Sequence, residues 1–426
     1  MAGSSLKGLP DPDWAQADAL LSTLRALSFD GVGITRDSYG KGEQQAHDLV
    51  RKQAELAGLQ VSVDAALNLY MTLPGRTPRT AVVMTGSHLD SVPRGGNYDG
   101  AAGVVAGLAV LSGWSKGGYQ PEHDVTVMAI RAEESAWFPV SYVGSKAAFG
   151  LLPPEALQAR RADTAQSLSE HLLCLGGDPH SLATQVPVLN PATIDSFVEV
   201  HIEQGPVLID AGVPLGIVSG ICGSLRYRKA RVLGVYAHSG ATPRSHRRDA
   251  VVAVSQLVVT LQQLWQSMEH EGYQLTVTVG QFATDPVQAD FSKVSGQVEF
   301  CIDLRSQQPL TLALMDERLQ RAMNEIAAEH GVTFDLGERT QSAAGVMSAQ
   351  LIAELHSAAQ MIGLQTQSLP SGAGHDAAVF AGQGIDTAML FIRNANGSHN
   401  PDEAMSIEDF RDATRVLGRV LAKRAG

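Results

Sequence analysis

Runs of apolar and β-branched residues along this chain end abruptly in clusters of polar residues. Runs of this length that stop at polar residues are typical of strands buried in a sheet. In open α/β sheets, ligands bind beyond the carboxyl ends of the strands, so the polar clusters predict a functional site at one sheet edge. The clearest runs are 81–85 before Gly86-Ser87-His88, 125–130 before Glu133-Glu134, and 197–200 before His201.

The segment after Asp99, residues 100–111, is small and apolar with almost no polar face. Such a segment is expected to form a buried helix that packs closely on a sheet. Strands and helices alternate in this part of the chain. The fold class expected is therefore α/β, with a catalytic domain built on a mixed sheet that carries helices on both faces.

The pattern changes between about residues 220 and 336 into a self-contained series of strands and helices. Their order is β-α-β-β-α-β, that of a ferredoxin-like domain. A unit of this size can form its own small core, so we expect residues 220–336 to be inserted into a discontinuous domain of residues 1–219 and 337–426. The expected strands of the insertion are 225–236, 274–282, 296–305 and 332–336, and its expected helices are 249–269 and 310–330.

Composition narrows the class of protein. A chain of 426 residues exceeds what one hydrophobic core usually organises, which favours two domains. It has no apolar run near the roughly 20 residues of a membrane helix, so no membrane association is expected. The net charge of −12 gives no reason to expect nucleic-acid binding. Residues 1–13 lack the basic start and apolar run of a secretion signal, which favours a cytoplasmic location.

The cysteines add little to the chemistry. The sequence contains three, Cys174, Cys222 and Cys301, and none of them forms a C-x-x-C pair. This spacing disfavours both a disulfide framework and a cysteine-based zinc site.

The first candidate functional residue is His88, which follows the apolar run 81–85. One ring nitrogen of a histidine can bind a metal while the other donates to a carboxylate, and Asp90 lies on the same side of an extended chain. His88 is thus a candidate metal ligand and Asp90 its orienting partner, with a hydrogen-bonded turn histidine as the alternative. Asp99, just before the apolar helix, is either a ligand or a helix N-cap.

Glu133 and Glu134 give a stronger indication of a bound cation. Adjacent carboxylates at the end of an apolar strand repel each other and lose hydration unless a cation compensates them. Neighbouring side chains on a strand point opposite ways, so one glutamate can reach a metal while the other faces an attacking water. A solvated surface loop is the alternative.

His201 and His399 complete a set of nitrogen and oxygen ligands without a thiolate. His399 lies in the turn sequence Gly397-Ser398-His399-Asn400-Pro401. This donor set favours Zn²⁺, Mn²⁺ or Co²⁺ over Ca²⁺. Two such cations that share a carboxylate polarise a carbonyl and activate a water, whose proton a nearby glutamate can take. The sequence has no Gly-x-Ser-x-Gly or P-loop motif, which disfavours serine and nucleotide chemistry.

Taken together, the motifs resemble those of the M20-type metallohydrolases and, within them, of the amidase, hydantoinase and carbamoylase branch. That branch includes N-carbamoyl-L-amino-acid hydrolases, allantoate amidohydrolases and β-ureidopropionases. The resemblance covers most of the chain, from Gly86 to Pro401. The motifs that carry it are, in order, T-G-S-H-L-D, Y-D-G, A-E-E, H-I-E-Q-G, H-S-G-A-T-P, S-G-A-G-H-D-A and G-S-H-N-P.

The resemblance implies a two-metal catalytic domain with an inserted lid and dimerisation domain, and hence a homodimer. It implies two divalent cations per subunit, bridged by Asp99, with Glu133 as the general base. A histidine at position 201, where peptidase relatives usually carry a carboxylate, points to this branch. The implied ligands are His88, Asp99 and His201 for one cation and Asp99, Glu134 and His399 for the other.

The resemblance also implies residues that bind a small substrate bearing a carboxylate. His238 would reach across the homodimer to polarise the scissile carbonyl. Arg305 would bind the substrate carboxylate, although a strand-end surface arginine is the alternative. Gln204 is a further expected contact, and His375 is expected either at the substrate or in a packing role.

Three features depart from the branch pattern, all in segments expected near the substrate. Ser292 stands where an asparagine is usual, Trp137 replaces an arginine, and residues 393–397 replace a loop that contains proline. We therefore expect the chemistry to be retained and the substrate to be unusual, with Ser292 as a candidate contact.

The leading hypothesis is a metal-dependent amidohydrolase that acts on an N-carbamoyl amino acid or a related ureido or amido acid. An aminoacylase or dipeptidase is the nearest enzymatic alternative, and it would release a carboxylic acid rather than ammonia. A metal-stabilised binding dimer without catalysis is the third hypothesis, and it requires Glu133 or the open metal position to be unusable.

Overall fold

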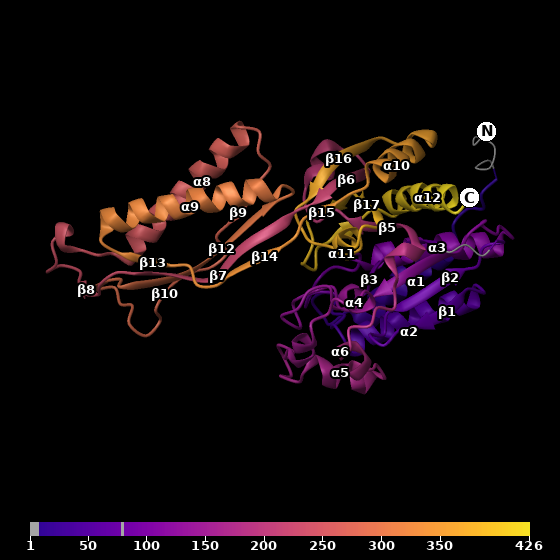
Figure 1. Ribbon diagram of the computed structural model, residues 1–426, viewed down its shortest axis with the longest axis horizontal. Helices are drawn as coiled ribbons and strands as arrows, with labels where there is room; N and C mark the ends of the chain where they lie inside the picture. Colours follow the sequence, from indigo (N-terminus) through magenta and orange to yellow (C-terminus); the bar gives the residue numbers. More distant parts are fainter. Residues whose placement is uncertain (1–7, 78–80) are drawn as a thin grey trace. The chain divides into compact units, whose positions relative to one another are not determined.

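The computed structural model describes residues 8–77 and 81–426, and the chain divides into two compact units (Figure 1). The first comprises the chain up to Ser219 with Val346–Leu369 and His375–Gly426. The second comprises Gly220–Gly345 and Pro370–Gly374. Residues 1–7, part of the segment considered for a secretion signal, lie outside the described residues.

The first unit is built on a mixed sheet in the order β1-β2-β4-β3-β5-β17-β6-β15, with β16 also paired to β6. The neighbouring strands β4, β3, β5 and β17 are parallel, whereas β2 runs antiparallel to β4 and β6 runs antiparallel to β17. The bounds are β1 (Gln60–Val63), β2 (Leu69–Leu73), β3 (Val82–His88), β4 (Val125–Ile130), β5 (Ile194–Ile202), β6 (Leu215–Ile221), β15 (Gly345–Val346), β16 (Thr366–Ser371) and β17 (Asp386–Ile392).

Two of the three predicted strands are longer than the apolar runs from which they were predicted. β4 has the predicted bounds, but β3 continues through His88 and β5 continues through Ile202. His88 still pairs with Ile130 of β4, because the backbone ladder continues past the point where the side chains become polar. His88 and His201 are therefore strand residues with fixed directions.

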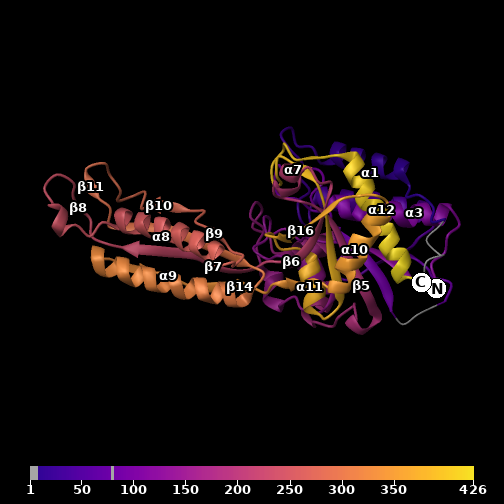
Figure 2. The ribbon, with the colours of Figure 1, turned by 90° about the horizontal axis from the view of Figure 1, so that it is seen from above.

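Helices cover both faces of this sheet, as predicted (Figures 1 and 2). On one face, α3 lies against β3, β4 and β5 with α12, α1 and α2 beside it, and α10 packs on α12 and β17. On the other face, Phe380 of α11 stacks on Phe197 of β5 with ring centroids 3.7 Å apart. The bounds are α1 (Trp14–Ser28), α2 (Lys41–Leu56), α3 (Ala101–Lys116), α4 (Val143–Ala148), α5 (Leu168–Leu175), α6 (Pro179–Ala183), α7 (Val207–Ala211), α10 (Ala349–Met361), α11 (Asp376–Gly382) and α12 (Ile407–Arg424).

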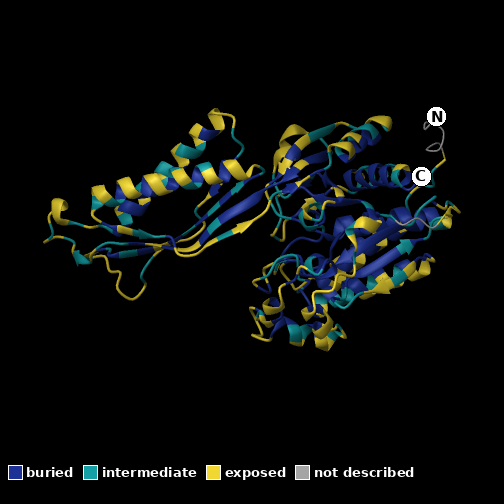
Figure 3. Ribbon diagram, viewed as in Figure 1, coloured by how far each residue is buried: buried dark blue, intermediate teal, exposed yellow. Residues whose placement is uncertain are grey.

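Helix α3 is the buried apolar helix expected after Asp99, and its residues from Ala101 to Trp114 are buried (Figure 3). Gly103 allows its close approach to the sheet, because a Cβ at this position would lie 2.0 Å from the carbonyl oxygen of Val200. The close packing holds the start of α3, and with it Asp99, against β5.

The second unit has its own sheet and its own hydrophobic core (Figure 2). Strands run in the order β10-β12-β7-β13, with β9 beside β12 and β14 beside β7, and α8 and α9 pack on them. The bounds are β7 (Gly223–Leu233), β8 (Ala237–His238), α8 (Ala250–His270), β9 (Thr276–Thr278), β10 (Phe282–Thr284), β11 (Lys293–Val294), β12 (Gln297–Ser306), α9 (Pro309–His330), β13 (Thr333–Asp335) and β14 (Arg339–Ser342).

The order of these elements follows the predicted β-α-β-β-α-β series, with the short strands β8 and β11 added as a separate pair and with two further differences. The strand expected at 274–282 is split into β9 and β10, which both pair with β12. The unit also extends to Gly345 rather than ending near residue 336, because β14 pairs with β7. No helix in the described part of the chain is long and apolar enough to cross a bilayer.

Candidate metal centre and active site

The parallel strands β4, β3, β5 and β17 bring their carboxyl ends to one edge of the sheet in the first unit. The predicted metal-binding and base residues lie at or just beyond this edge. They are His88 at the end of β3, Asp99 before α3, Glu133 and Glu134 after β4, His201 in β5, and His399 after β18 (Asn394–Ala395).

Asp99 lies at the centre of this cluster. Its Oδ1 is 3.1 Å from Nε2 of His201 and 3.5 Å from Nε2 of His88. Its Oδ2 is 3.3 Å from Nε2 of His399, which is itself 3.1 Å from Oε1 of Glu134. The donor atoms thus form two groups of three that share Asp99, and each group is compact enough for one metal ion.

The alternative reading of Asp99 as a helix N-cap is wrong. The residue at the N-cap of α3 is Gly100, and no side chain makes a capping hydrogen bond there. The Asp99 carboxylate instead faces three imidazoles. Although burial opposes it, His201, His399 and His88 hold the pKa of Asp99 well below its ordinary range.

The residues of the cluster fit a divalent cation. Asp99 is 3% exposed, and within the described chain its Oδ1 is a buried atom without a hydrogen-bond partner. A buried carboxylate oxygen without a partner is costly unless a positive charge faces it. The donors are imidazole nitrogens and carboxylate oxygens, a set that suits Zn²⁺, Mn²⁺ or Co²⁺.

Backbone carbonyls orient two of the imidazoles. Nδ1 of His88 is 3.0 Å from the carbonyl oxygen of Asp90, and Nδ1 of His201 is 2.9 Å from that of Ile202. Because a carbonyl oxygen only accepts, each Nδ1 donates its hydrogen to the backbone, and each Nε2 is left as the ring atom that would bind a metal ion. This is the arrangement that metal-binding histidines adopt.

Gly100 gives His88 the space for this orientation. It has a φ of +65°, and a Cβ on it would lie 2.5 Å from Cε1 of His88. The N–H of Gly100 lies 3.2 Å from Nε2 of His201 and makes a long hydrogen bond to its lone pair. A metal ion bound to His201 would use the same lone pair. Both the backbone conformation and the available space therefore require glycine here.

Asp90 lies beside His88 and also accepts hydrogen bonds from the backbone of the two glutamates. Its Oδ1 is 3.3 Å from Nδ1 of His88 and accepts the N–H of Glu133 at 3.1 Å. Its Oδ2 accepts the N–H of Glu134 at 3.2 Å and the hydroxyl of Ser38 at 2.6 Å. One buried carboxylate thus links the end of β3 to the turn after β4.

Burial raises the pKa of the Glu133 carboxyl well above its ordinary value. The charge of His88 opposes this shift, while the nearby carboxylates of Glu134 and Asp376 add to it. A carboxylate whose pKa is closer to neutral is a better proton acceptor at working pH, which suits a general base.

Two residues that the sequence analysis did not single out fix Asp99 from the other side. Oγ of Ser398 lies 2.5 Å from Oδ2 of Asp99 and 2.8 Å from Oε2 of Glu403. Oε1 of Glu403 accepts the N–H groups of Tyr98 at 2.7 Å and of Asp99 at 3.3 Å. Ser398 and Glu403 lie on either side of His399 in the sequence G-S-H-N-P-D-E. The motif that predicted His399 as a ligand therefore also contained these two residues.

Arg36 is a third residue that the sequence did not reveal. It is completely buried, and its guanidinium donates to the carbonyl of Leu89 at 2.6 Å and to Asn97 at 3.3 Å. Burial lowers its pKa to about 10, so it keeps its charge near the carboxylates of Glu403 and Asp99. It holds the loop that carries the first ligands, and nothing local in the sequence indicates this.

Gln204 and His375, expected at the substrate, both lie beside the candidate ligands. Nε2 of Gln204 is 3.0 Å from Oδ2 of Asp99 and 3.3 Å from Nε2 of His399. His375 is buried with its ring centroid 4.6 Å from that of His201, and these two histidines form a further close group with Glu199. Substrate contact by either residue stays a prediction.

His238, Ser292 and Arg305 belong to the second unit. Nδ1 of the exposed His238 accepts the N–H groups of Gly240 and Ala241, both at 3.1 Å. Ser292 lies close to His238, because the backbone carbonyl of Ser292 accepts the N–H of Ser239 at 2.8 Å.

The guanidinium of Arg305 is held within the same unit. It donates to Oδ2 of Asp303 at 2.8 and 3.1 Å and to the carbonyl of Gly372 at 2.7 Å. The roles of these residues toward substrate stay predictions.

Two of the departures from the branch pattern make structural contacts. Trp137 is 9% exposed, its Nε1 donates to the carbonyl of Ser91 at 2.8 Å, and the guanidinium of Arg161 lies over its ring. Arg393 donates to the Asp409 carboxylate of α12 at 2.8 and 3.1 Å. These side chains hold the loops near the site in place.

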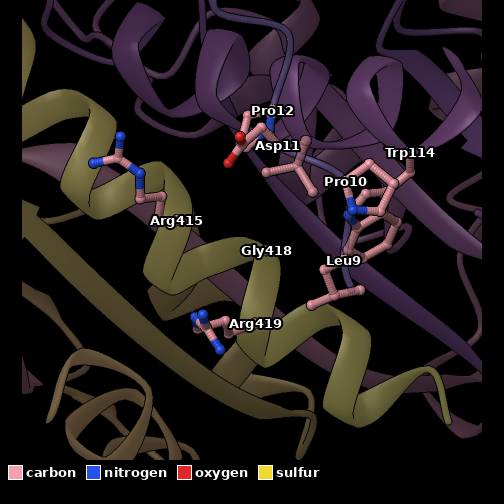
Figure 4. A pocket seen from close by; sticks show the side chains of 9 residues that line it. Leu9, Pro10, Asp11, Pro12, Trp114, Arg415, Gly418 and Arg419 are labelled. Carbon is pink, nitrogen blue, oxygen red and sulfur yellow. The ribbon is translucent and has the colours of Figure 1, made fainter. Parts of the chain in front are cut away.

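A separate small hollow of about 80 Å³ lies between α12, α3 and the segment before α1 (Figure 4). None of the candidate ligands is among the described residues that line it. The lining residues are Leu9, Pro10, Asp11, Pro12, Val110, Trp114, Arg415, Gly418 and Arg419.

Comparison with known proteins adds a family match. A family model described as peptidase family M20/M25/M40 matches residues 84–423. An N-carbamoyl-L-amino acid amidohydrolase from Geobacillus stearothermophilus is 37% identical over 388 residues, which cover 90% of this chain and 92% of that protein. An allantoate amidohydrolase from Escherichia coli (strain K12) is 32% identical over 413 residues, which cover 96% of this chain and 98% of that protein.

A solved structure of a hydantoinase/carbamoylase family amidase from Burkholderia ambifaria has the same fold. The two superpose with a TM-score of 0.86 at 30% identity, over 98% of this chain and 99% of that one. The resemblance drawn from the motifs and the α/β fold class are confirmed by these matches.

Proposed function

This chain belongs to peptidase family M20/M25/M40, and on that premise we propose that it is a metal-dependent amidohydrolase. Its substrate would be an N-carbamoyl amino acid or a related ureido or amido acid, in which it hydrolyses a non-peptide C–N bond. The relatives named above support this substrate class. The observation that carries the reaction is Glu133 beside two groups of ligands that share Asp99.

We propose two divalent cations per subunit, Zn²⁺, Mn²⁺ or Co²⁺. When bound, they would polarise the substrate carbonyl and lower the pKa of the attacking water toward about 7. The residues that would hold them are His88, Asp99 and His201 for one and Asp99, Glu134 and His399 for the other.

Glu133 takes the proton of the attacking water and later delivers it to the leaving nitrogen. The water oxygen bonds to the carbonyl carbon, and the C–N bond breaks as the nitrogen gains the proton. For a carbamoyl substrate, the released carbamic acid decomposes to carbon dioxide and ammonia. Asp90 keeps Glu133 in place through its backbone N–H.

The second unit would supply substrate-binding groups in a homodimer. Arg305 suits a substrate carboxylate because a guanidinium presents parallel donors in a fork, and its contacts to Asp303 and Gly372 fix its direction. His238 of one subunit would polarise the scissile carbonyl in its partner. Ser292 lies beside His238, which makes it a candidate for substrate selectivity.

The test is ammonia release by the Mn²⁺- or Zn²⁺-loaded protein on a panel of N-carbamoyl amino acids, allantoate and ureidopropionate. Glu133→Gln is the matched variant, since it keeps the shape of the side chain but cannot accept the proton. We expect ammonia from the wild type and a loss of turnover of about 1,000-fold in the variant at unchanged metal content.

Two outcomes would contradict the proposal. An active Glu133→Gln variant would remove the base from the mechanism. Release of a carboxylic acid from N-acyl amino acids, without ammonia from any ureido substrate, would favour the aminoacylase reading.

A further inference from the structure

The turn between β4 and the paired glutamates has an unusual backbone conformation. Ala132 is completely buried and has a φ of +48°, in the left-handed region. A residue with a Cβ rarely adopts this conformation, and it persists only where the surroundings hold it. The residue directly before the proposed base is therefore held in place by something outside the turn.

Buried side chains hold every backbone N–H of this turn. Each of four successive N–H groups donates to a side-chain oxygen from another part of the chain. These bonds run from Arg131 to Oδ1 of Asn68 at 3.0 Å, from Ala132 to Oε1 of Glu43 at 2.8 Å, from Glu133 to Oδ1 of Asp90 at 3.1 Å, and from Glu134 to Oδ2 of Asp90 at 3.2 Å.

Glu43 is the partner of the strained residue itself. It lies in the first turn of α2 and is completely buried. Its other oxygen, Oε2, accepts the N–H of Tyr39 at 2.6 Å and Nη1 of Arg131 at 3.1 Å. Both carboxylate oxygens are thus occupied, and the guanidinium of Arg131 balances the charge.

The conformation of Ala132 has a consequence for the two glutamates. A regular strand would send Glu133 and Glu134 to opposite faces of the sheet. The left-handed residue ends the strand geometry, and Glu134 then reaches His399 while Glu133 stays buried near His88. A relaxed turn at Ala132 would redirect both carboxylates.

We propose that Glu43 is a positioning residue for the reaction. Its bond to the Ala132 N–H stabilises the left-handed turn that directs Glu133 toward the attacking water and Glu134 toward its metal. Glu43 belongs to none of the candidate ligand groups and acts through the backbone N–H of Ala132. This inference rests on the proposed function, because that function assigns Glu133 and Glu134 their roles.

The test is a double-mutant cycle of Glu43→Gln and Ala132→Gly. A glutamine keeps one acceptor oxygen, so either the Ala132 N–H or the pair of donors on Oε2 loses its acceptor. We expect Glu43→Gln to lower kcat about 100-fold with little change in KM, since small displacements of catalytic groups cost this much.

Glycine at position 132 adopts a positive φ without strain and so needs no external support. We therefore expect Ala132→Gly alone to keep kcat and to restore most of it in the Glu43→Gln background. A merely structural role for Glu43 would not be rescued, because glycine adds no stability elsewhere. Independent, multiplicative losses in the double variant would overturn the proposal.

Tyr39→Phe is the matched control. It removes a buried hydroxyl bond to the carbonyl of Ala66, 2.9 Å long, in the same cluster but leaves the turn untouched. It should lower thermal stability and keep kcat. A loss of kcat in this control would show that the reaction responds to destabilisation in general, which also contradicts the proposal.

Metal affinity provides a readout that does not depend on turnover. Calorimetric titration of the metal-free protein with Mn²⁺ should show weaker binding in Glu43→Gln and recovery in the double variant, because Glu134 moves with the turn. If the wild type hydrolyses no ureido substrate, the proposed function fails, and this titration still decides the role of Glu43. Should Glu43→Gln not fold, Glu43→Asp replaces it in the same cycle, since it keeps the charge but shortens the reach.

Discussion

At the scale of single residues, the site depends on how Asp99 is surrounded. Both of its oxygens face imidazole nitrogens, and Ser398 and Gln204 hold Oδ2 from the remaining side. The Glu403 carboxylate fixes the backbone at the same position. A carboxylate held so firmly keeps both groups of donors at a constant separation, as the proposed pair of metal ions would require.

Gly100→Ala tests whether this geometry determines metal affinity. A Cβ at this position would lie 2.5 Å from the His88 ring, and the φ of +65° adds strain. We expect the affinity for the first metal to fall by about 10- to 100-fold, as for other changes that disturb ligand orientation. Calorimetric titration of the metal-free protein with Zn²⁺ measures it.

Gly118→Ala is the control for backbone strain alone. Its φ is +71°, and a Cβ there meets nothing within 4 Å. It should destabilise the fold by about 1 kcal/mol without changing metal affinity. Equal metal affinity in Gly100→Ala and the wild type would show that His88 does not need its present orientation.

The sequence was sufficient to predict candidate residues that lie in recognisable local motifs. His88, Asp99, Glu134, His201 and His399 have ligand chemistry at strand or turn ends, and the structure brings them together. Residues that act through contacts with sequence-distant parts of the chain belong to no such motif and were not predicted. Arg36 reaches the loop of Asn97 across the chain, and Glu43 reaches Ala132, so neither role is visible without the fold.

At the scale of elements, helix α3 positions the site by packing closely on the sheet. Gly103→Ala tests this contact. A helix interior normally gains stability when alanine replaces glycine, by about 0.5–1 kcal/mol. At Gly103, however, the new Cβ would lie 2.0 Å from the carbonyl oxygen of Val200, so we expect a loss of about 1–3 kcal/mol in a urea unfolding experiment.

Gly418→Ala in α12 is the matched control for this change. Gly418 is also buried inside a helix, but its Cβ would make an ordinary contact with Val110 at 3.5 Å. We expect it to leave stability unchanged or to raise it slightly. Similar effects of the two substitutions would mean that α3 shifts away from the sheet without cost.

Element order was more predictable than element length. The helices α8 and α9 and the strand β4 follow their apolar patterns closely. β3 and β5 run on through polar residues, because a strand ends where its partner ladder ends rather than where its side chains change. The split between β9 and β10 likewise reflects pairing with β12, which no local pattern encodes.

At the scale of the whole molecule, the chain contains two separate hydrophobic cores. One core joins the sheet of the first unit to α1, α3, α10 and α12, and the other joins the second sheet to α8 and α9. The sequence predicted an insertion from its change in element order. Its end was misplaced, because β14 returns to β7 from far along the chain. Whether the second unit acts as a lid and dimerises stays a prediction.

Metal removal should affect the two units differently, because every candidate ligand belongs to the first one. Metal that binds only the folded state at 1,000 times its Kd stabilises by about 4 kcal/mol. Without it, Oδ1 of the buried Asp99 carboxylate has no hydrogen-bond partner and faces only the imidazoles of His88 and His201, which disfavours the folded first unit. Hydrogen exchange with and without a chelator, followed peptide by peptide, should therefore show faster exchange in α3 and β5 and unchanged exchange in β7 and β12. Equal acceleration in both units would mean that they unfold as one, and no acceleration in either would mean that the cluster around Asp99 binds no structural metal.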